Sequence, residues 1–246
     1  MLAQEDNQLY VMKKLETKTM SKKDALSAKQ EVQLLQRLRH PCIVAYKDNF
    51  TTPTGTLCIV MAYCEAGDLS QRLEAAKKKR ELLKEEDIIE WIIQIALSLH
   101  FLHGQRVLHR DLKSKNIFLQ GGSIKLGDFG IAKVLGGTGM ANTMIGTPMY
   151  MAPEQYNEKP YGFKTDMWSF GCVAYEACTG NFAFQAQNIN ALARKVKRAE
   201  YPPIPSRYSK ELRQLIGLML SKSPKLRPTC AEVLQRPELR AHAQAW

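Results

Sequence analysis

The side chains best suited to catalysis lie together in a short polar segment near the middle of the chain. Residues 109–116 read His-Arg-Asp-Leu-Lys-Ser-Lys-Asn. Transfer of a phosphoryl group to a hydroxyl needs an acceptor for the hydroxyl proton and a side-chain oxygen that binds Mg²⁺. Asp111 can supply the first group and Asn116 the second, both from one loop. The segment therefore indicates phosphoryl transfer.

Two later segments extend this pattern. Twelve residues after Asn116, residues 128–130 read Asp-Phe-Gly, and residues 152–154 read Ala-Pro-Glu. Alone, Asp-Phe-Gly is a weak signal, because an ordinary turn aspartate explains it as well. Together and in this order, the three segments match the signature set of protein kinases. The resemblance implies that Asp128 is a Mg²⁺ ligand beside Asn116.

Three longer segments narrow the resemblance to one kinase family. Residues 61–69 (MAYCEAGDL), 126–132 (LGDFGIA) and 146–154 (GTPMYMAPE) closely resemble the NIMA-related (NEK) kinases. Gly127, directly before the Asp-Phe-Gly segment, is the most telling residue, and the likeness runs from about Leu9 to the C-terminal end. It implies a serine/threonine kinase that uses ATP and Mg²⁺ and phosphorylates proteins on serine or threonine hydroxyls.

The same resemblance assigns the nucleotide phosphates to Lys13, with Glu31 as its ion-pair partner on a helix. Lys14 is the alternative lysine. Successive side chains of a strand point to opposite faces, so Val11 and Lys13 share a face that excludes Lys14. If Val11 packs on the adenine, Lys13 faces the nucleotide. For Glu31 the alternative is a solvated helix glutamate, which would be the default without the motif context.

The remaining nucleotide contacts are also implied by the resemblance. Met61 would be the gatekeeper residue, and Ala62 and Cys64 would be hinge residues that offer backbone groups to the adenine. Val11 and Phe118 would enclose the adenine ring. Packing alone explains these residues equally well, so they do not by themselves indicate activity.

Three further roles near the active site follow from the resemblance. Lys113 is similar to the lysine with which serine/threonine kinases neutralise the transferring phosphoryl group. Asp166 should anchor the backbone of residues 109–116 from a buried helix. Glu154 should pair with Arg227. The last two roles are structural and not catalytic.

Control by phosphorylation is suggested by Arg110, next to Asp111, because such an arginine can order an activation segment by pairing with a phosphate. Thr143 is the leading acceptor by analogy and Thr138 the second. Thr147, four residues after Thr143, is expected to hydrogen-bond near Asp111. The alternative for Thr143 is an unmodified polar loop residue.

The elements around these residues predict an α+β, two-lobed protein kinase fold. Strand-like runs at 9–15, 42–46 and 56–61 and a helix at 22–38 predict a small β-rich N-lobe. From residue 68 the pattern becomes helical, with broad apolar faces at 88–102 and 165–178, and short strands are expected at 107–108, 117–119 and 124–126. The expected kinase domain, 1–246, divides into a partial N-lobe (1–62), a hinge (63–67) and a C-lobe (68–246) with the activation segment at 128–154.

A glycine-rich phosphate loop is expected before Lys13, but no Gly-x-Gly-x-x-Gly pattern precedes it. The first strand and this loop are therefore expected to be absent, which should lower ATP affinity and turnover. Two explanations stay open, a truncated active kinase or a natural short form that acts as a pseudokinase scaffold. We favour truncation, because a scaffold should show substitutions at Asp111, Asn116 or Asp128.

Composition and charge argue against several other function classes. The 246 residues are 45% hydrophobic, which suits a folded core, and the net charge of +11 could favour nucleic acid, an anionic membrane or acidic proteins. The longest basic run, 77–80, precedes acidic residues and lacks interleaved aromatics, so solvated surface explains it better than nucleic-acid binding. Six cysteines without a C-x-x-C pair indicate buried thiols, with neither zinc nor disulfides.

Membrane association is not expected either. The N-terminus lacks an apolar signal segment, and the apolar run 88–102 carries Glu90, Gln94 and His100. We therefore expect a cytoplasmic protein, with a cytoskeletal association implied only by the family resemblance. No segment of the chain supports oligomerisation.

Overall fold

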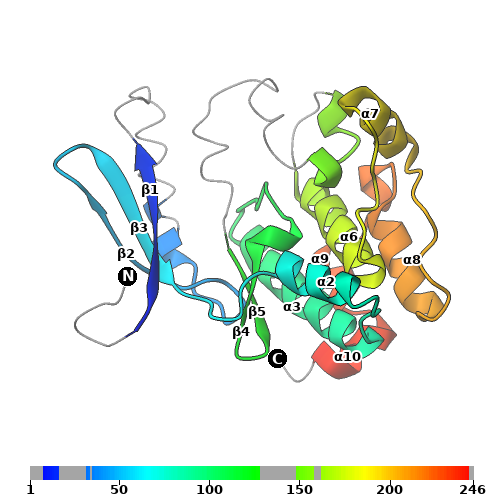
Figure 1. The fold of residues 1–246 in the computed structure, drawn as a ribbon, viewed down its shortest axis with the longest axis horizontal. Helices are drawn as coiled ribbons and strands as arrows, with labels where there is room; N and C mark the ends of the chain where they lie inside the picture. Colours follow the sequence, from blue (N-terminus) through cyan, green and yellow to red (C-terminus); the bar gives the residue numbers. More distant parts are fainter. Residues whose placement is uncertain (1–7, 17–31, 34, 128–147, 158–161, 244–246) are drawn as a thin grey trace.

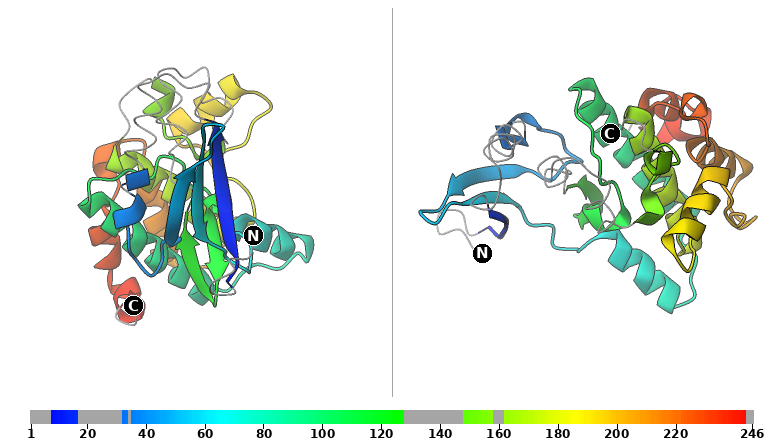
Figure 2. Two further views of the ribbon diagram at one scale, coloured as in Figure 1. Left: turned by 90° about the vertical axis from the view of Figure 1, so that its left-hand side faces the viewer. Right: turned by 90° about the horizontal axis from the view of Figure 1, so that it is seen from above.

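The computed structural model describes residues 8–16, 32–33, 35–127, 148–157 and 162–243, and they form two lobes. One lobe is a three-stranded antiparallel sheet and the other is mostly helical (Figures 1 and 2). The segment 63–68 runs from the sheet to the first helix of the larger lobe. The predicted two-lobed α+β fold is confirmed.

The small sheet has the strand order β1-β3-β2 and consists of β1 (Tyr10–Glu16), β2 (Tyr46–Thr51) and β3 (Thr56–Ala62). The central strand β3 is apolar along its length, as a strand with neighbours on both sides should be. Its turn from β2 needs Gly55, which has φ +82° and whose N–H donates to the Thr52 carbonyl at 2.8 Å. The register places Val11 opposite Met61.

The strand predicted at 42–46 is wrong. β2 begins only at Tyr46 and continues through polar residues to Thr51, as an edge strand often does. The apolar residues before it pair with β5 instead, where the Leu126 N–H donates to the Cys42 carbonyl at 2.8 Å and the Val44 N–H to the Leu126 carbonyl at 2.9 Å. The strand expected at 107–108 is also not formed. Of the helix expected at 22–38, residues 32–33 and 35–38 are described, and all of these except Leu38 are helical.

A hairpin of β4 (Ile117–Gln120) and β5 (Ser123–Leu126) lies between the sheet and the helices (Figure 1). It is tied to the hinge because the Leu119 N–H donates to the Gly67 carbonyl at 2.9 Å and the Ala66 N–H to the Leu119 carbonyl at 3.2 Å. Ile117 pairs with Leu126, so the residues just before β4 and just after β5 are neighbours. The hairpin thereby brings together the ends of two loops that the sequence marks as functional.

The larger lobe is built around α6 (Phe163–Thr179), which packs against α3 (Glu85–Gly104) and α8 (Lys210–Met219). Residues 165–178 are all buried, and the helix ends at Gly180, whose φ is +66°. This confirms the prediction of a helix buried on every side. In the described part of the chain, no helix combines the length and the apolar character needed to cross a bilayer. The other helices are α2 (Leu69–Lys78), α7 (Ile189–Arg198), α9 (Cys230–Leu234) and α10 (Pro237–Ala243), with short 3-10 turns η1 (Ser114–Asn116), η2 (Pro148–Tyr150), η3 (Gln155–Asn157) and η4 (Pro224–Leu226).

Candidate active site

The catalytic loop, residues 109–116, brings its three predicted functional side chains into contact. The Lys113 ammonium lies 2.8 Å from Asp111 Oδ2. Asn116 Nδ2 donates to the Asp111 carbonyl at 2.7 Å and to Asp111 Oδ2 at 3.0 Å. Lys113 and Asn116 thus both bind the Asp111 carboxylate. A carboxylate, an ammonium and an amide oxygen therefore share one polar site.

The start of this loop is held by the buried Asp166 on α6. Its carboxylate accepts the backbone N–H groups of His109 at 3.0 Å and Arg110 at 3.1 Å, and it lies 2.9 Å from His103 Nε2. Burial opposes ionisation of Asp166, but the hydrogen bonds from His103 and from the backbone N–H of His109 hold its pKa below the usual range. The predicted anchoring role of Asp166 is confirmed.

Arg110 shows why such an anchor is needed. Its φ is +66°, in the left-handed region that non-glycine residues seldom adopt, and that conformation costs on the order of 1–2 kcal/mol. The bonds from Asp166 to the backbone of residues 109 and 110 offset this cost. The turn aims the Asp111 side chain away from the buried helix toward Lys113 and Asn116.

His109 links the loop to the end of the hairpin. Burial lowers its pKa, so the ring is neutral. Its Nδ1 accepts the Asp111 N–H at 3.3 Å, and its Nε2 lies 3.2 Å from the Gly127 carbonyl, which requires the proton on Nε2. The Gly127 N–H donates to the Asn116 carbonyl at 3.0 Å. Gly127 is thus bonded to both ends of the catalytic loop.

The packing around Gly127 explains why glycine stands there. A Cβ at this position would lie 2.8 Å from Val44 Cγ2 and 2.9 Å from Phe118 Cε2, closer than real Cβ atoms approach other atoms. Both neighbours line the cavity described next. A larger residue at position 127 would therefore push side chains into that cavity.

A cavity of about 850 Å³, the interlobe cavity, is formed by β1, β3, the hinge segment and β4. Its volume falls in the range of roughly 300–1,000 Å³ typical of ligand pockets. The structure places six predicted nucleotide-binding residues along it, and it adds Val44, which the sequence analysis missed. The six are Val11, Lys13, Met61, Ala62, Cys64 and Phe118.

The two lysines of β1 differ in exposure and in their position relative to the interlobe cavity. Lys13 is partly buried and lines the interlobe cavity, whereas Lys14 is exposed and lies outside its lining. This is the alternation expected of a strand. The other predicted site residues, Glu31, Asp128, Thr138, Thr143 and Thr147, lie outside the described residues.

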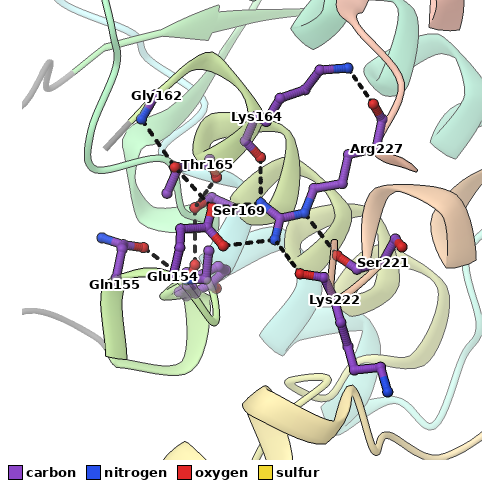
Figure 3. Close-up of polar contacts among 11 residues, drawn as sticks. Glu154, Gln155, Gly162, Lys164, Thr165, Ser169, Ser221, Lys222 and Arg227 are labelled. Atoms are coloured by element: carbon purple, nitrogen blue, oxygen red, sulfur yellow. Dashed lines mark hydrogen bonds and ion pairs between the residues drawn. The ribbon is translucent and has the colours of Figure 1, made fainter. Parts of the chain in front are cut away.

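Glu154 and Arg227 form a buried ion pair with two hydrogen bonds of 2.7 and 2.8 Å, as predicted (Figure 3). The guanidinium also donates to the carbonyls of Lys164 at 2.7 Å and Ser221 at 2.9 Å, and its carbon lies 5.0 Å from the centre of the Trp168 ring. Burial opposes ionisation of Glu154, but Arg227 holds its pKa below the usual range. The pair fastens the segment after the activation loop to the helical lobe.

A second buried carboxylate, Glu176, was missed by the sequence analysis. Its oxygens accept from the Ser114 hydroxyl at 3.2 Å and from the Tyr150 hydroxyl, and burial raises its pKa. Ser114 and Tyr150 are themselves 3.0 Å apart. The available signal was a glutamate inside a helix expected to be buried on every side, since a buried carboxylate requires hydrogen-bonding partners.

Comparison with known proteins gives consistent matches. Residues 1–238 match the protein kinase domain family. Serine/threonine-protein kinase Nek4 of Mus musculus is 45% identical over 239 residues, covering 96% of this chain and 30% of that protein. Nek1 of Mus musculus is 43% identical over 234 residues, covering 94% and 19%, and Nek11 of Homo sapiens is 39% identical over 238 residues, covering 96% and 37%. The chain thus spans well under half the length of these relatives.

Proposed function

We propose that this chain, which belongs to the protein kinase family, transfers the γ-phosphoryl group of ATP to serine or threonine hydroxyls of proteins. The similarity to NEK kinases expected from the sequence is confirmed by the relatives described above. The single observation that carries the proposal is the convergence of Lys113 and Asn116 on Asp111 Oδ2, at 2.8 and 3.0 Å, within one loop.

The roles of these side chains follow from their chemistry. Asp111 would orient the substrate hydroxyl and accept its proton. Lys113, whose ammonium is already beside that carboxylate, would offset negative charge on the transferring group. The amide oxygen of Asn116, with its nitrogen engaged by Asp111, would hold Mg²⁺ together with Asp128. Mg²⁺-ATP supplies the transferable phosphoryl group and the charge that the metal neutralises.

The interlobe cavity suits the nucleotide. Val11, Val44 and Phe118 give apolar walls for an adenine ring, and Lys13 offers a cation for its phosphates. Within the described ranges, no hydrogen bond occupies the backbone N–H or carbonyl of Cys64, so both can face the base. We infer that Met61 and Ala62 complete this side of the pocket and that Glu31 pairs with Lys13.

Regulation by phosphorylation is a further part of the proposal. A phosphate on Thr143 would pair with Arg110, and Thr147 would hydrogen-bond beside Asp111. Replacement of Thr143 by alanine should then lower the activity of the phosphorylated protein. Equal activity of the phosphorylated protein and the Thr143→Ala variant would contradict regulation through Thr143. We expect the protein to act in the cytoplasm on protein substrates, an expectation that rests on the family resemblance.

Phosphotransfer from γ-labelled ATP to a general serine/threonine substrate protein tests the main proposal. Asp111→Asn should lower the rate by about 10²- to 10⁴-fold, the usual contribution of a positioned base. Asp48→Asn, which removes the same charge from an exposed position on β2, should leave the rate unchanged. Mg²⁺-ATP should raise the melting temperature of both variants. An Asp111→Asn rate equal to that of the Asp48 control would overturn the proposal.

A further inference from the structure

A second cavity, of about 340 Å³, lies beside the catalytic loop and is separate from the interlobe cavity. It is bounded by α2, by residues 113–115 of the loop and by the end of α6. We call it the Lys115 cavity. It includes Lys113, whose ammonium is 2.8 Å from the proposed base Asp111. A peptide whose hydroxyl reaches Asp111 must therefore place a residue only a few positions away beside this cavity.

The two carboxylates in the cavity wall are already engaged. Glu176 accepts hydrogen bonds on both oxygens, from Ser114 at 3.2 Å and from Tyr150, and it is buried. Glu74 lies 2.9 Å from Lys78, its neighbour one turn along α2. Lys78 offsets the charge of Glu74, and burial raises the pKa of Glu176 and so opposes its ionisation.

The lysines of the wall are less engaged. Lys77 donates to the neutral amide oxygen of Asn181 at 2.8 Å, so its charge is not cancelled by that contact. Lys115 is exposed, and among the described residues none forms a hydrogen bond or ion pair with its ammonium. Lys113 is paired with Asp111, so Lys77 and Lys115 are the two lining ammonium groups that no carboxylate of the described residues contacts directly. The net field favours an anion.

We propose that the Lys115 cavity binds an anionic side chain of the protein substrate, a carboxylate or a phosphorylated hydroxyl, within a few residues of the acceptor serine or threonine. This rests on the proposed function. Ammonium groups bind carboxylate and phosphate through charge-assisted hydrogen bonds, and a phosphate with its charge near −2 engages two lysines better than a carboxylate does. Lys115 and Lys77 are the residues that select the substrate.

Peptides with one threonine and uncharged flanks test this inference. At each flanking position, glutamine is replaced in turn by glutamate, phosphoserine, lysine or leucine, and kcat/KM is measured with Mg²⁺-ATP. Glutamate should exceed glutamine by about 1.5- to fivefold at one position or two adjacent ones, as expected for solvent-exposed ion pairs, and phosphoserine should exceed glutamate. The preference should weaken as salt is raised.

Charge reversal identifies the residue responsible. Lys115→Glu should abolish the preference for glutamate and favour lysine, measured as the ratio of kcat/KM for the two peptides, which cancels any loss common to both. Lys79→Glu is the matched control, because Lys79 is an exposed lysine at the end of α2 that does not line the cavity. The Lys79→Glu variant should prefer glutamate peptides as strongly as the unaltered protein does.

The remaining outcomes separate this inference from the proposed function. No transfer to the uncharged peptide would count against the proposed function, and peptide affinity measured by fluorescence anisotropy would still decide the cavity assignment. Equal affinity for glutamate and lysine peptides would overturn the assignment. A preference for lysine peptides that Glu176→Gln removes would also overturn the assignment, because Glu176 would then set the selectivity. A preference for leucine peptides would overturn it as well.

Discussion

Glu154→Gln gives the sharpest test of how the helical lobe is held together. Gln keeps the size of Glu154 but carries no charge, and its amide nitrogen would face one of the Arg227 nitrogens. The Arg227 side chain has no exposed surface and that of Glu154 only 8%. The other partners of the guanidinium are neutral carbonyls, including those of Lys164 and Ser221. The variant therefore leaves a buried charge that nothing else neutralises.

The expected magnitude follows from this burial. Removing one partner of a buried ion pair costs about 3–5 kcal/mol, because the remaining charge stays out of water. For a chain of this size, each 1 kcal/mol lowers the melting temperature by about 2–4 °C. Glu154→Gln should therefore lower the melting temperature by roughly 6–20 °C. The segment that Glu154 fastens should lose order before the rest of the lobe.

Differential scanning fluorimetry with circular dichroism would measure this change. Glu200→Gln is the matched control, because Glu200 lies 3.7 Å from Arg198 with both side chains largely exposed. It should barely alter the melting temperature. Arg227→Met alone and combined with Glu154→Gln completes a double-mutant cycle, and the combined loss should be smaller than the sum. A Glu154→Gln shift no larger than that of Glu200→Gln would refute the reasoning.

Three further predictions concern the same framework. Gly127→Ala should destabilise the protein by about 1–3 kcal/mol and weaken Mg²⁺-ATP binding in calorimetry, whereas Gly104→Ala, with no atom within 4 Å of its Cβ, should do neither. In the folded protein the pKa of Glu154 lies below its usual 4.5. Its ionised carboxylate therefore stabilises the fold fully above pH 4.5, and this stabilisation is lost as the pH falls through the pKa of the folded state. The stability of Glu154→Gln should depend less steeply on pH in that range, as acid unfolding would measure. Asp166→Asn should lower kcat by about 10- to 100-fold with a smaller change in KM, because the substitution loosens the backbone before Asp111 and leaves the interlobe cavity unchanged. Equal changes in kcat and KM would contradict the positioning role of Asp166.

The parts of the site that the sequence predicted are those encoded locally. Asp111, Lys113 and Asn116 lie within six residues, so the short loop itself keeps them near one another. The choice of Lys13 over Lys14 combined the family resemblance with strand alternation, and Lys13 lines the interlobe cavity whereas Lys14 does not. Asp166 could be linked to the loop because residues 166–171 resemble the kinase segment that plays this role, and the helix that carries it was expected to be buried.

The parts that the sequence did not predict depend on contacts between distant segments. Cys42 and Val44 form an apolar run typical of a strand, but they pair with Leu126, more than eighty residues away. Polar residues carry the real edge strand β2, which therefore shows little apolar alternation. Glu176 meets Ser114 and Tyr150 across separations of 62 and 26 residues, and no local pattern indicates such a network.

The buried helix α6 connects these observations. Asp166 near its start bonds the backbone before Asp111, and Glu176 near its end bonds Ser114, two residues before Asn116. The two carboxylates are ten residues apart on one helix, a rise of about 15 Å. Because α6 is enclosed on all sides, neither carboxylate can relax without moving its neighbours. A single rigid element thus sets the positions of the proposed base and of the Lys115 cavity, so substrate selection and catalysis should respond together to any shift of α6.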